Sequence, residues 1–163
     1  MALPAPTLSL KGRALRYLAA REHSRAELER KLTPHLQDGD DPATLARLLD
    51  ELTAKGFISE TRVAESVLHR RGARLGSARV LHELRAKGLP AEVLADAAAQ
   101  LRATELARAE HIWRARFGQA PQDAAERARQ MRFLAGRGFS GEVIRRLLNT
   151  LARDPAPDAP PPA

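Results

Sequence analysis

One stretch of the sequence decides the fold: Asp41-Pro42-Ala43-Thr44-Leu45-Ala46-Arg47-Leu48-Leu49-Asp50-Glu51-Leu52-Thr53-Ala54-Lys55-Gly56. Asp41 is a preferred N-cap residue, and a proline at the first helical position already has the backbone angle of a helix. Four leucines then recur at the spacing of a single helix face. Gly56 can adopt the left-handed conformation that commonly ends a helix. The stretch therefore predicts an amphipathic helix over residues 42–55.

Similar start and stop signals recur along the chain. Ser24 and Glu27 have the spacing of a capping box, in which each side chain accepts a hydrogen bond from the other residue's backbone N–H. Ser59, Ser77 and Asp123 are further candidate N-caps. Strong helix formers dominate, and no sustained alternation of apolar and polar residues indicates a strand. We therefore predict an all-α fold, with helices over residues 10–22, 25–36, 42–55, 60–73, 78–87, 91–101, 105–117, 124–136 and 141–152.

These helices group into threes, and three short segments resemble one another. The segments are residues 52–57 (LTAKGF), 84–89 (LRAKGL) and 134–139 (LAGRGF). A glycine followed by an apolar residue is also a general helix C-cap, so both true repeats and a common way of ending helices remain open. We predict an elongated tandem array of three three-helix repeats, over residues 10–58, 59–102 and 103–153. The proline-rich residues 154–163 are predicted to form a disordered tail.

The composition excludes several classes of protein. The chain has 163 residues and no cysteine, which rules out a disulfide scaffold, a thiol nucleophile, an iron–sulfur cluster and a zinc ribbon. The first residues lack the pattern of a secretory signal, and no apolar run approaches 18 residues. We therefore expect a monomeric cytoplasmic protein that does not enter a membrane.

Motifs that would indicate catalysis or a bound nucleotide fail on their context. Residues 136–141 (GRGFSG) match the glycine pattern of dinucleotide-binding loops, but they follow a predicted helix, whereas such loops follow a strand. Residues 38–41 (DGDD) resemble the start of a calcium loop, but the glycine and the final glutamate of that loop are missing. The sequence therefore predicts no catalytic residues and no cofactor.

The histidines and the single tryptophan have structural explanations. No two of the five histidines have the helical spacing of metal ligands, so we interpret them as surface or boundary residues and predict no metal site. Trp113 shares a helix face with Leu106, Ala109 and Phe117, which favours a place in the core over a partner-binding role. Nothing in the sequence indicates an enzyme.

Positive charge increases toward the C-terminal half. The chain has 27 Lys and Arg against 20 Asp and Glu, a net charge of +7; residues 10–60 are neutral, residues 61–100 carry +3 and residues 101–153 carry +6. Nearly all of this charge is arginine, whose planar fork suits carboxylate and phosphate contacts. The alternative is that these side chains only solvate helix ends. The candidate partner-binding residues are Arg70, Arg71, Arg74, Arg79, Arg85, Lys87, Arg129, Arg132, Arg145 and Arg146.

Several segments resemble the RecX family of bacterial recombination regulators. The longest is residues 14–32 (ALRYLAAREHSRAELERKL), which is similar to the start of that family's sequences. Residues 52–57, 62–66 (RVAES) and 84–89 resemble the middle repeat, and residues 132–139 (RFLAGRGF) resemble the third. The resemblance covers residues 10–150.

The resemblance implies an all-helical protein of three three-helix units that is not an enzyme. It further implies binding to the RecA recombinase filament on DNA, with inhibition of its ATP hydrolysis, strand exchange and coprotease action, in DNA repair, recombination and the SOS response. This chain has Ile58-Ser59-Glu60 where the family usually has an acidic pair after the Gly-aromatic turn. It also has Val63 in place of an aromatic residue and Gly76-Ser77 in place of glycine-proline.

Two hypotheses for function follow. In the first, the protein regulates RecA by binding its nucleoprotein filament, with arginines facing acidic protein surface and DNA phosphate. In the second, it is a stand-alone basic helical module that binds DNA through phosphate contacts. Binding to naked DNA compared with binding to the filament distinguishes the two.

Overall fold

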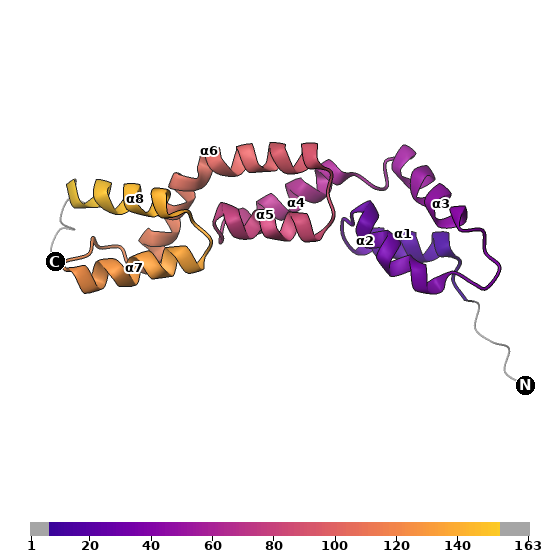
Figure 1. Ribbon diagram of the computed structural model, residues 1–163, viewed down its shortest axis with the longest axis horizontal. Helices are drawn as coiled ribbons and strands as arrows, with labels where there is room; N and C mark the ends of the chain where they lie inside the picture. Colours follow the sequence, from indigo (N-terminus) through magenta and orange to yellow (C-terminus); the bar gives the residue numbers. More distant parts are fainter. Residues whose placement is uncertain (1–6, 154–163) are drawn as a thin grey trace, which may run out of the picture. The chain divides into compact units, whose positions relative to one another are not determined.

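The computed structural model describes residues 7–153, which form a series of helices connected by short loops (Figure 1). The predicted all-α fold is confirmed, because no strand occurs among these residues. The predicted disordered tail lies outside the described residues. The elements are α1 (Leu10–Ala20), α2 (Arg25–Leu32), the 3₁₀ turn η1 (Thr33–His35), α3 (Ala43–Ala54), α4 (Glu60–Gly72), α5 (Ser77–Ala86), α6 (Ala91–Arg116), α7 (Ala124–Gly136) and α8 (Gly141–Arg153).

A predicted break between two helices and a predicted helix end are wrong. Helices were expected over residues 91–101 and 105–117, but α6 continues without a break. Residues 102–104 (RAT) contain neither glycine nor proline, so nothing interrupts the backbone hydrogen bonds there. The helix expected to reach residue 36 ends at Leu32, because Pro34 cannot continue an α-helix and the chain tightens into a 3₁₀ turn.

The predicted capping box accounts for the start of α2, whereas α3 begins one residue later than predicted, at Ala43, with Pro42 as its N-cap. Ser24 Oγ accepts a hydrogen bond from the Glu27 N–H at 3.1 Å, and Glu27 Oε2 accepts from the Ser24 N–H at 2.9 Å. Asp41 Oδ1 accepts from the Ala43 N–H at 2.9 Å. These bonds satisfy backbone donors that have no partner inside the helix, so the local sequence determines where each helix begins.

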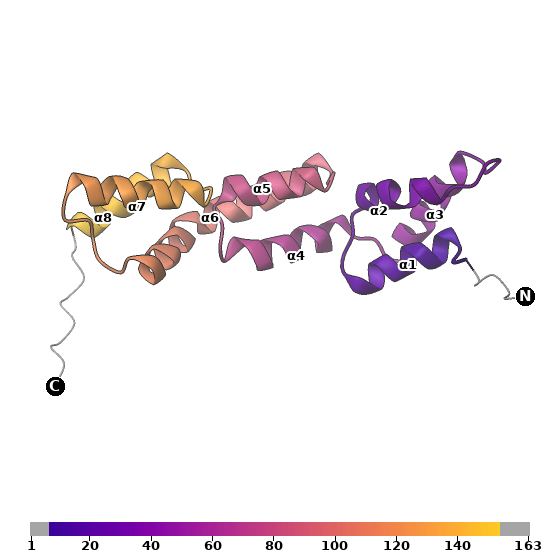
Figure 2. The same cartoon turned by 90° about the horizontal axis from the view of Figure 1, so that it is seen from below.

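The described chain forms two compact units. Unit 1 comprises residues 7–66 and 84–94, and unit 2 comprises residues 67–83 and 95–153. In unit 1, α1, α2 and α3 pack together around one apolar core (Figure 2). Three of the four leucines of the opening stretch are buried in that core, and Leu48 packs against it. The buried residues of this core are Ala14, Leu28, Leu32, Leu45, Leu49, Leu52 and Ile58.

His23 lies inside unit 1, so its interpretation as a surface or boundary residue is wrong. The residue is 1% exposed. Its Nδ1 lies 3.0 Å from the carbonyl oxygen of Arg21, and its Nε2 lies 3.0 Å from Lys31 Nζ. Nδ1 therefore carries the hydrogen that it donates to the carbonyl, and Nε2 accepts from the ammonium. Burial lowers the pKa of His23, and the charges of Arg21 and Lys31 lower it further.

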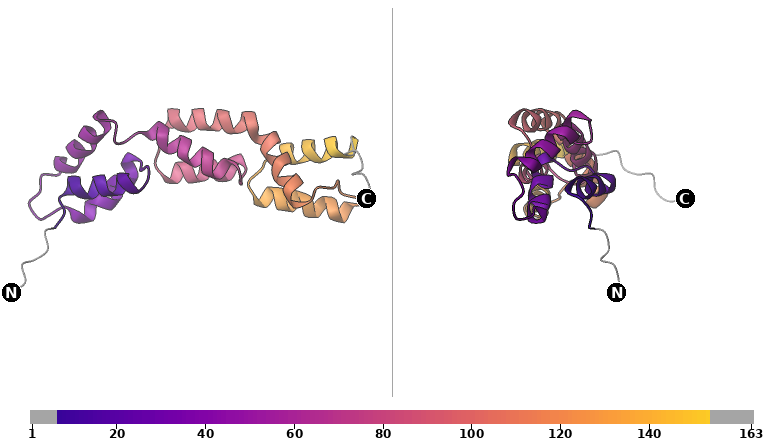
Figure 3. Two further views of the ribbon diagram at one scale, coloured as in Figure 1. Left: turned by 180° about the vertical axis from the view of Figure 1, so that it is seen from behind. Right: turned by 90° about the vertical axis from the view of Figure 1, so that its right-hand side faces the viewer.

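In unit 2, the C-terminal part of α6 packs with α7 and α8 (Figure 3). The predicted core position of Trp113 is confirmed, since it is 3% exposed and its Nε1 donates to Gln130 Oε1 at 2.7 Å. Burying the indole while satisfying its N–H avoids the cost of an unpaired polar group. The other buried apolar residues of this core are Ala109, Leu134, Phe139, Ile144, Leu147 and Leu148.

Two loops of unit 2 are joined through their backbones. The Gly76 N–H donates to the carbonyl of Arg137 at 2.8 Å, and the Ala78 N–H donates to the carbonyl of Gly138 at 3.2 Å. A Cβ atom at Gly76 would overlap backbone atoms of Gly138 and Phe139. Glycine at position 76 thus allows the loop after α4 to lie directly against the loop after α7, and this contact builds one wall of the site described below.

Candidate functional site

The structure distributes the ten candidate cationic residues between the two units. Arg85 and Lys87 belong to unit 1. The remaining eight belong to unit 2, where all have exposed side chains: Arg70, Arg71, Arg74, Arg79, Arg129, Arg132, Arg145 and Arg146. Unit 2 therefore collects most of the predicted partner-binding charge.

Lys87 and Arg71 are engaged in ion pairs inside their own unit. Lys87 Nζ lies 3.2 Å from Glu27 Oε1, and the lysine side chain is only 15% exposed. Burial disfavours the Glu27 carboxylate, but hydrogen bonds from Arg21, the Ser24 N–H and Lys87 outweigh it and lower the pKa of Glu27 to about 2. Arg71 pairs with Glu83 at 3.0 Å, at the surface of unit 2. Lys87 thus has a structural role in unit 1.

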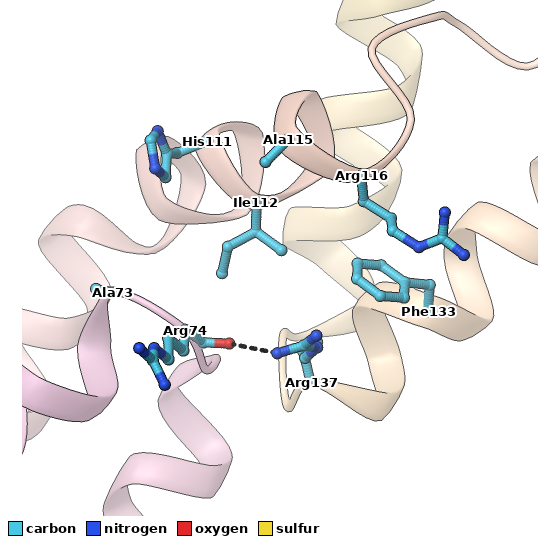
Figure 4. Close-up of a pocket in the computed structure, with 8 residues that line it drawn as sticks. All are labelled: Ala73, Arg74, His111, Ile112, Ala115, Arg116, Phe133 and Arg137. Atoms are coloured by element: carbon cyan, nitrogen blue, oxygen red, sulfur yellow. Dashed lines mark hydrogen bonds between the residues drawn. The ribbon is translucent and has the colours of Figure 1, made fainter.

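A pocket of about 280 Å³ in unit 2 gathers cationic side chains that are far apart in the sequence (Figure 4). We call it the basic pocket. Its polar lining consists of Arg74, His111, Arg116 and Arg137, and its apolar lining consists of Ala73, Ile112, Ala115 and Phe133. Only Arg74 was among the candidate residues. None of the described residues that line the pocket is acidic.

The three arginines of the basic pocket each stand at the C-terminal end of a helix. Arg74 follows the last residue of α4 by two positions, Arg116 is the last residue of α6, and Arg137 is the C-cap of α7. The carbonyl end of a helix carries about half a negative charge, which favours a cation there. Arg137 directly precedes Gly138 and Arg116 stands two residues before Gly118, and both glycines have positive φ angles. A basic residue close to a glycine helix stop was therefore the sequence signal for these two positions.

Aromatic rings hold Arg116 and Arg137 in place. The Arg116 guanidinium carbon lies 5.4 Å from the Phe117 ring centroid and 5.8 Å from that of Phe133. The Arg137 guanidinium carbon lies 5.1 Å from the Phe133 centroid. The two rings meet edge to face, with centroids 5.3 Å apart. A guanidinium attracted to a ring face can still direct its N–H groups elsewhere, so these contacts orient the arginines without consuming their donors.

Arg108 fixes the loop that carries Arg74. Its Nη1 donates to the carbonyls of Leu75 at 2.6 Å and Gly72 at 3.2 Å. Its Nη2 donates to Ser77 Oγ at 3.2 Å. Ser77 was predicted to be an N-cap, but it is the first residue of α5 and its hydroxyl accepts from this arginine instead. Arg108 is half-buried and acts as a positioning residue behind the pocket, a role for which the sequence carried no signal.

The positive charge of the basic pocket is not neutralised within residues 7–153. Arg74, Arg116 and Arg137 make no ion pair with a carboxylate there, whereas Arg114, on the same helix as Arg116, pairs with Glu110 at 2.6 Å. The partial negative charges of the helix ends are smaller than the charges of the guanidinium groups, so the pocket is net positive. Such a site attracts anionic groups from outside the molecule.

The described residues contain neither a candidate metal cluster nor a candidate membrane-spanning helix. Among residues 7–153 there is no group of three histidine, aspartate or glutamate side chains placed to hold a metal ion. In the same range no helix is both long and apolar enough to span a bilayer.

Comparison with known proteins identifies the family. Residues 11–35 match the profile described as "RecX, first three-helix domain", and residues 103–148 match "RecX, third three-helix domain". "Regulatory protein RecX" of Leptothrix cholodnii is 59% identical over 148 residues, which are 91% of this chain and 92% of the relative. The protein of the same name from Ralstonia nicotianae is 51% identical, over 91% of both chains.

A solved structure shares the fold. The crystal structure of RecX from Lactobacillus salivarius superposes with a TM-score of 0.73, over 88% of this chain and 95% of that one, at 18% identity. The resemblance noted in the sequence is confirmed by these relatives. At the identities found over nearly their whole length, this chain belongs to the RecX family of regulatory proteins.

Proposed function

We propose that this protein binds the RecA recombinase filament on DNA and inhibits its ATP hydrolysis, strand exchange and coprotease action. The observation that carries the proposal is the 59% identity to a protein named regulatory protein RecX, across 92% of that relative. The basic surface of unit 2 supports it, because a filament of protein on DNA presents both carboxylates and phosphates. The protein acts in this role by binding and not as an enzyme.

Inhibition by binding needs a difference in affinity between states of the filament. A regulator that binds the inactive arrangement of RecA more tightly than the active one shifts the population toward inactivity, by no more than that difference in affinity.

Most of the contact with the filament is assigned in this proposal to the exposed arginines of unit 2. Arg85 adds to it from unit 1, and Lys87 is left out because it is held by Glu27.

The test is charge reversal at the end of α4. Replacing Arg70, Arg71 and Arg74 by glutamate changes six units of charge, and the surface pair of Arg71 with Glu83 that it breaks contributes about 0–1 kcal/mol to stability. We expect this variant to require far more protein than the wild type to suppress RecA-dependent ATP hydrolysis on single-stranded DNA.

The control carries the same change of charge elsewhere. Arg16, Arg102 and Arg153 are exposed and lie outside the candidate set, so their replacement by glutamate also changes six units of charge. This control should inhibit nearly as well as the wild type. Equal loss of inhibition in both variants would show a dependence on net charge alone, and full inhibition by the first variant would exclude the α4 arginines.

The second hypothesis, a stand-alone DNA-binding module, is favoured by one observation, the charge of +6 on residues 101–153. Lys and Arg contacts to phosphate give sequence-independent affinity that falls steeply with salt. If the isolated protein binds naked single-stranded DNA as tightly as the RecA filament, this hypothesis replaces the first.

A further inference from the structure

We propose that the basic pocket of unit 2 is the anchor point for an acidic peptide segment of the protein partner, one that carries an apolar side chain between carboxylates. This inference rests on the proposed function and names the chemistry that its contact surface recognises. Three features of the pocket support it: a row of cations, an apolar floor, and an aromatic ring that is already occupied.

The cations are arranged as a row. In Figure 4 the guanidinium groups of Arg74, Arg137 and Arg116 follow one another across the pocket. Arg137 makes one hydrogen bond within the described residues, a long one of 3.4 Å to the carbonyl of Arg74, and its other N–H groups have no acceptor there. A row of this kind matches an extended ligand with successive negative groups better than a single compact anion. The net positive charge of the row favours a ligand that carries carboxylates.

The floor of the pocket is apolar. Ile112 points from α6 into the space between the arginines, and Ala73 and Ala115 lie on either side of it (Figure 4). An apolar side chain that entered here would be removed from water while carboxylates on its two sides met the arginines. Interfaces between proteins concentrate their affinity in such places, where an apolar anchor is surrounded by arginine and aromatic residues.

The aromatic ring argues against a nucleic acid as the occupant. Single-stranded nucleic acids gain affinity by stacking bases on exposed aromatic faces. Phe133 lies between Arg116 and Arg137 in Figure 4, with guanidinium carbons 5.8 and 5.1 Å from its centroid, and its edge-to-face partner is Phe117. A base stacking on Phe133 would therefore have to compete with two guanidinium groups that already lie over this ring. Carboxylate ligands need no such face, because they meet the guanidinium edges.

The experiment uses the full chain and two assays. The first measures binding of an array of overlapping 15-residue peptides that span the RecA sequence. The second measures the protein concentration that gives half-maximal inhibition of RecA ATP hydrolysis. The variants are Arg137→Gln, Arg116→Gln and Ile112→Ala, with Arg102→Gln as the matched control, since Arg102 is an exposed arginine of α6 outside the pocket. Circular dichroism verifies that each variant folds.

The expected result is that acidic peptides containing an apolar residue bind the wild type and the control. The pocket variants should lose this binding, and their half-maximal inhibitory concentration should rise at least about tenfold, equivalent to about 1.4 kcal/mol. Arginine variants that are less stable but inhibit normally would show that these side chains only complement helix ends, which overturns the proposal. A different outcome would overturn the proposal in favour of nucleic acid. In that outcome the wild type binds no peptide but binds a hexathymidylate oligonucleotide, and the pocket variants lose the oligonucleotide binding.

The two proposals fail in different ways. If the wild type does not inhibit RecA at all, the proposed function is wrong. If the wild type inhibits and every pocket variant inhibits equally well, the function stands and the pocket is not its anchor.

Discussion

His23 shows how one residue can depend on its folded surroundings. Its ring is enclosed in unit 1, stacks at a tilt of 48° against Tyr17 and accepts a hydrogen bond from Lys31. The same ammonium lies 4.6 Å from the centre of the Tyr17 ring. A protonated imidazole would lose the bond from Lys31 and place a second cation beside it. The folded state therefore requires the neutral form of His23.

This requirement predicts a dependence of stability on pH. The pKa of His23 is lowered in the folded protein, so around and below its ordinary value of 6.5 the unfolded state binds more protons and folding stability falls as pH falls. We expect the free energy of unfolding to decrease between pH 7.5 and pH 5.5, as measured by urea denaturation. In a His23→Gln variant this decrease should be smaller. An identical decrease in the variant would assign the effect to other groups.

At the scale of the elements, local capping and long-range packing have separate roles. Ser24 and Glu27 start α2 through contacts within three residues of each other. The conformation of the loop before α5 depends instead on residues more than sixty positions away, because the Gly76 N–H donates to the carbonyl of Arg137. Arg108 of α6 holds the same loop through the carbonyls of Gly72 and Leu75. The conformation of the loop before α5 is therefore set by tertiary contacts.

Substitution of Gly76 by alanine tests that dependence. The added methyl group would overlap the backbone at Gly138 and Phe139, which cannot move aside as a flexible side chain can. We expect a loss of about 1–3 kcal/mol in the free energy of unfolding, the usual cost of overpacking. Gly72→Ala is the matched control, since a Cβ there meets no atom within 4 Å. A Gly76→Ala variant as stable as that control would contradict the close approach of the two loops.

At the scale of the whole molecule, the net charge of +7 predicts how association responds to salt. Charged partners are steered together over a screening length of about 10 Å at 0.1 M salt and about 3 Å at 1 M. We expect the association rate with the RecA filament to fall strongly from 0.05 to 0.5 M NaCl in surface-based kinetic measurements, with a much smaller change in the dissociation rate. An association rate that does not change with salt would show that electrostatic steering does not contribute to binding.

The sequence by itself determined the helices and the family. The helix start that it predicted at Ser24 depends on hydrogen bonds between residues three positions apart, which are visible in the linear sequence. The sequence also predicts that the leucines of the opening stretch lie in a core, because their spacing places them on one face of a helix. The break expected near residue 103 was wrong, because residues 102–104 include neither glycine nor proline and the helix continues through them.

Only the tertiary structure decided which cations share a site. Arg74 and Arg137 are 63 residues apart, and they line one pocket because backbone bonds between their loops join the ends of two helices. The two cations Arg137 and Lys87 also differ in their partners. Arg137 makes one long hydrogen bond, whereas Lys87 forms an ion pair with Glu27 inside unit 1. In the sequence these residues are equivalent exposed cations of the same charge. Their difference arises from long-range pairing, which no local periodicity encodes.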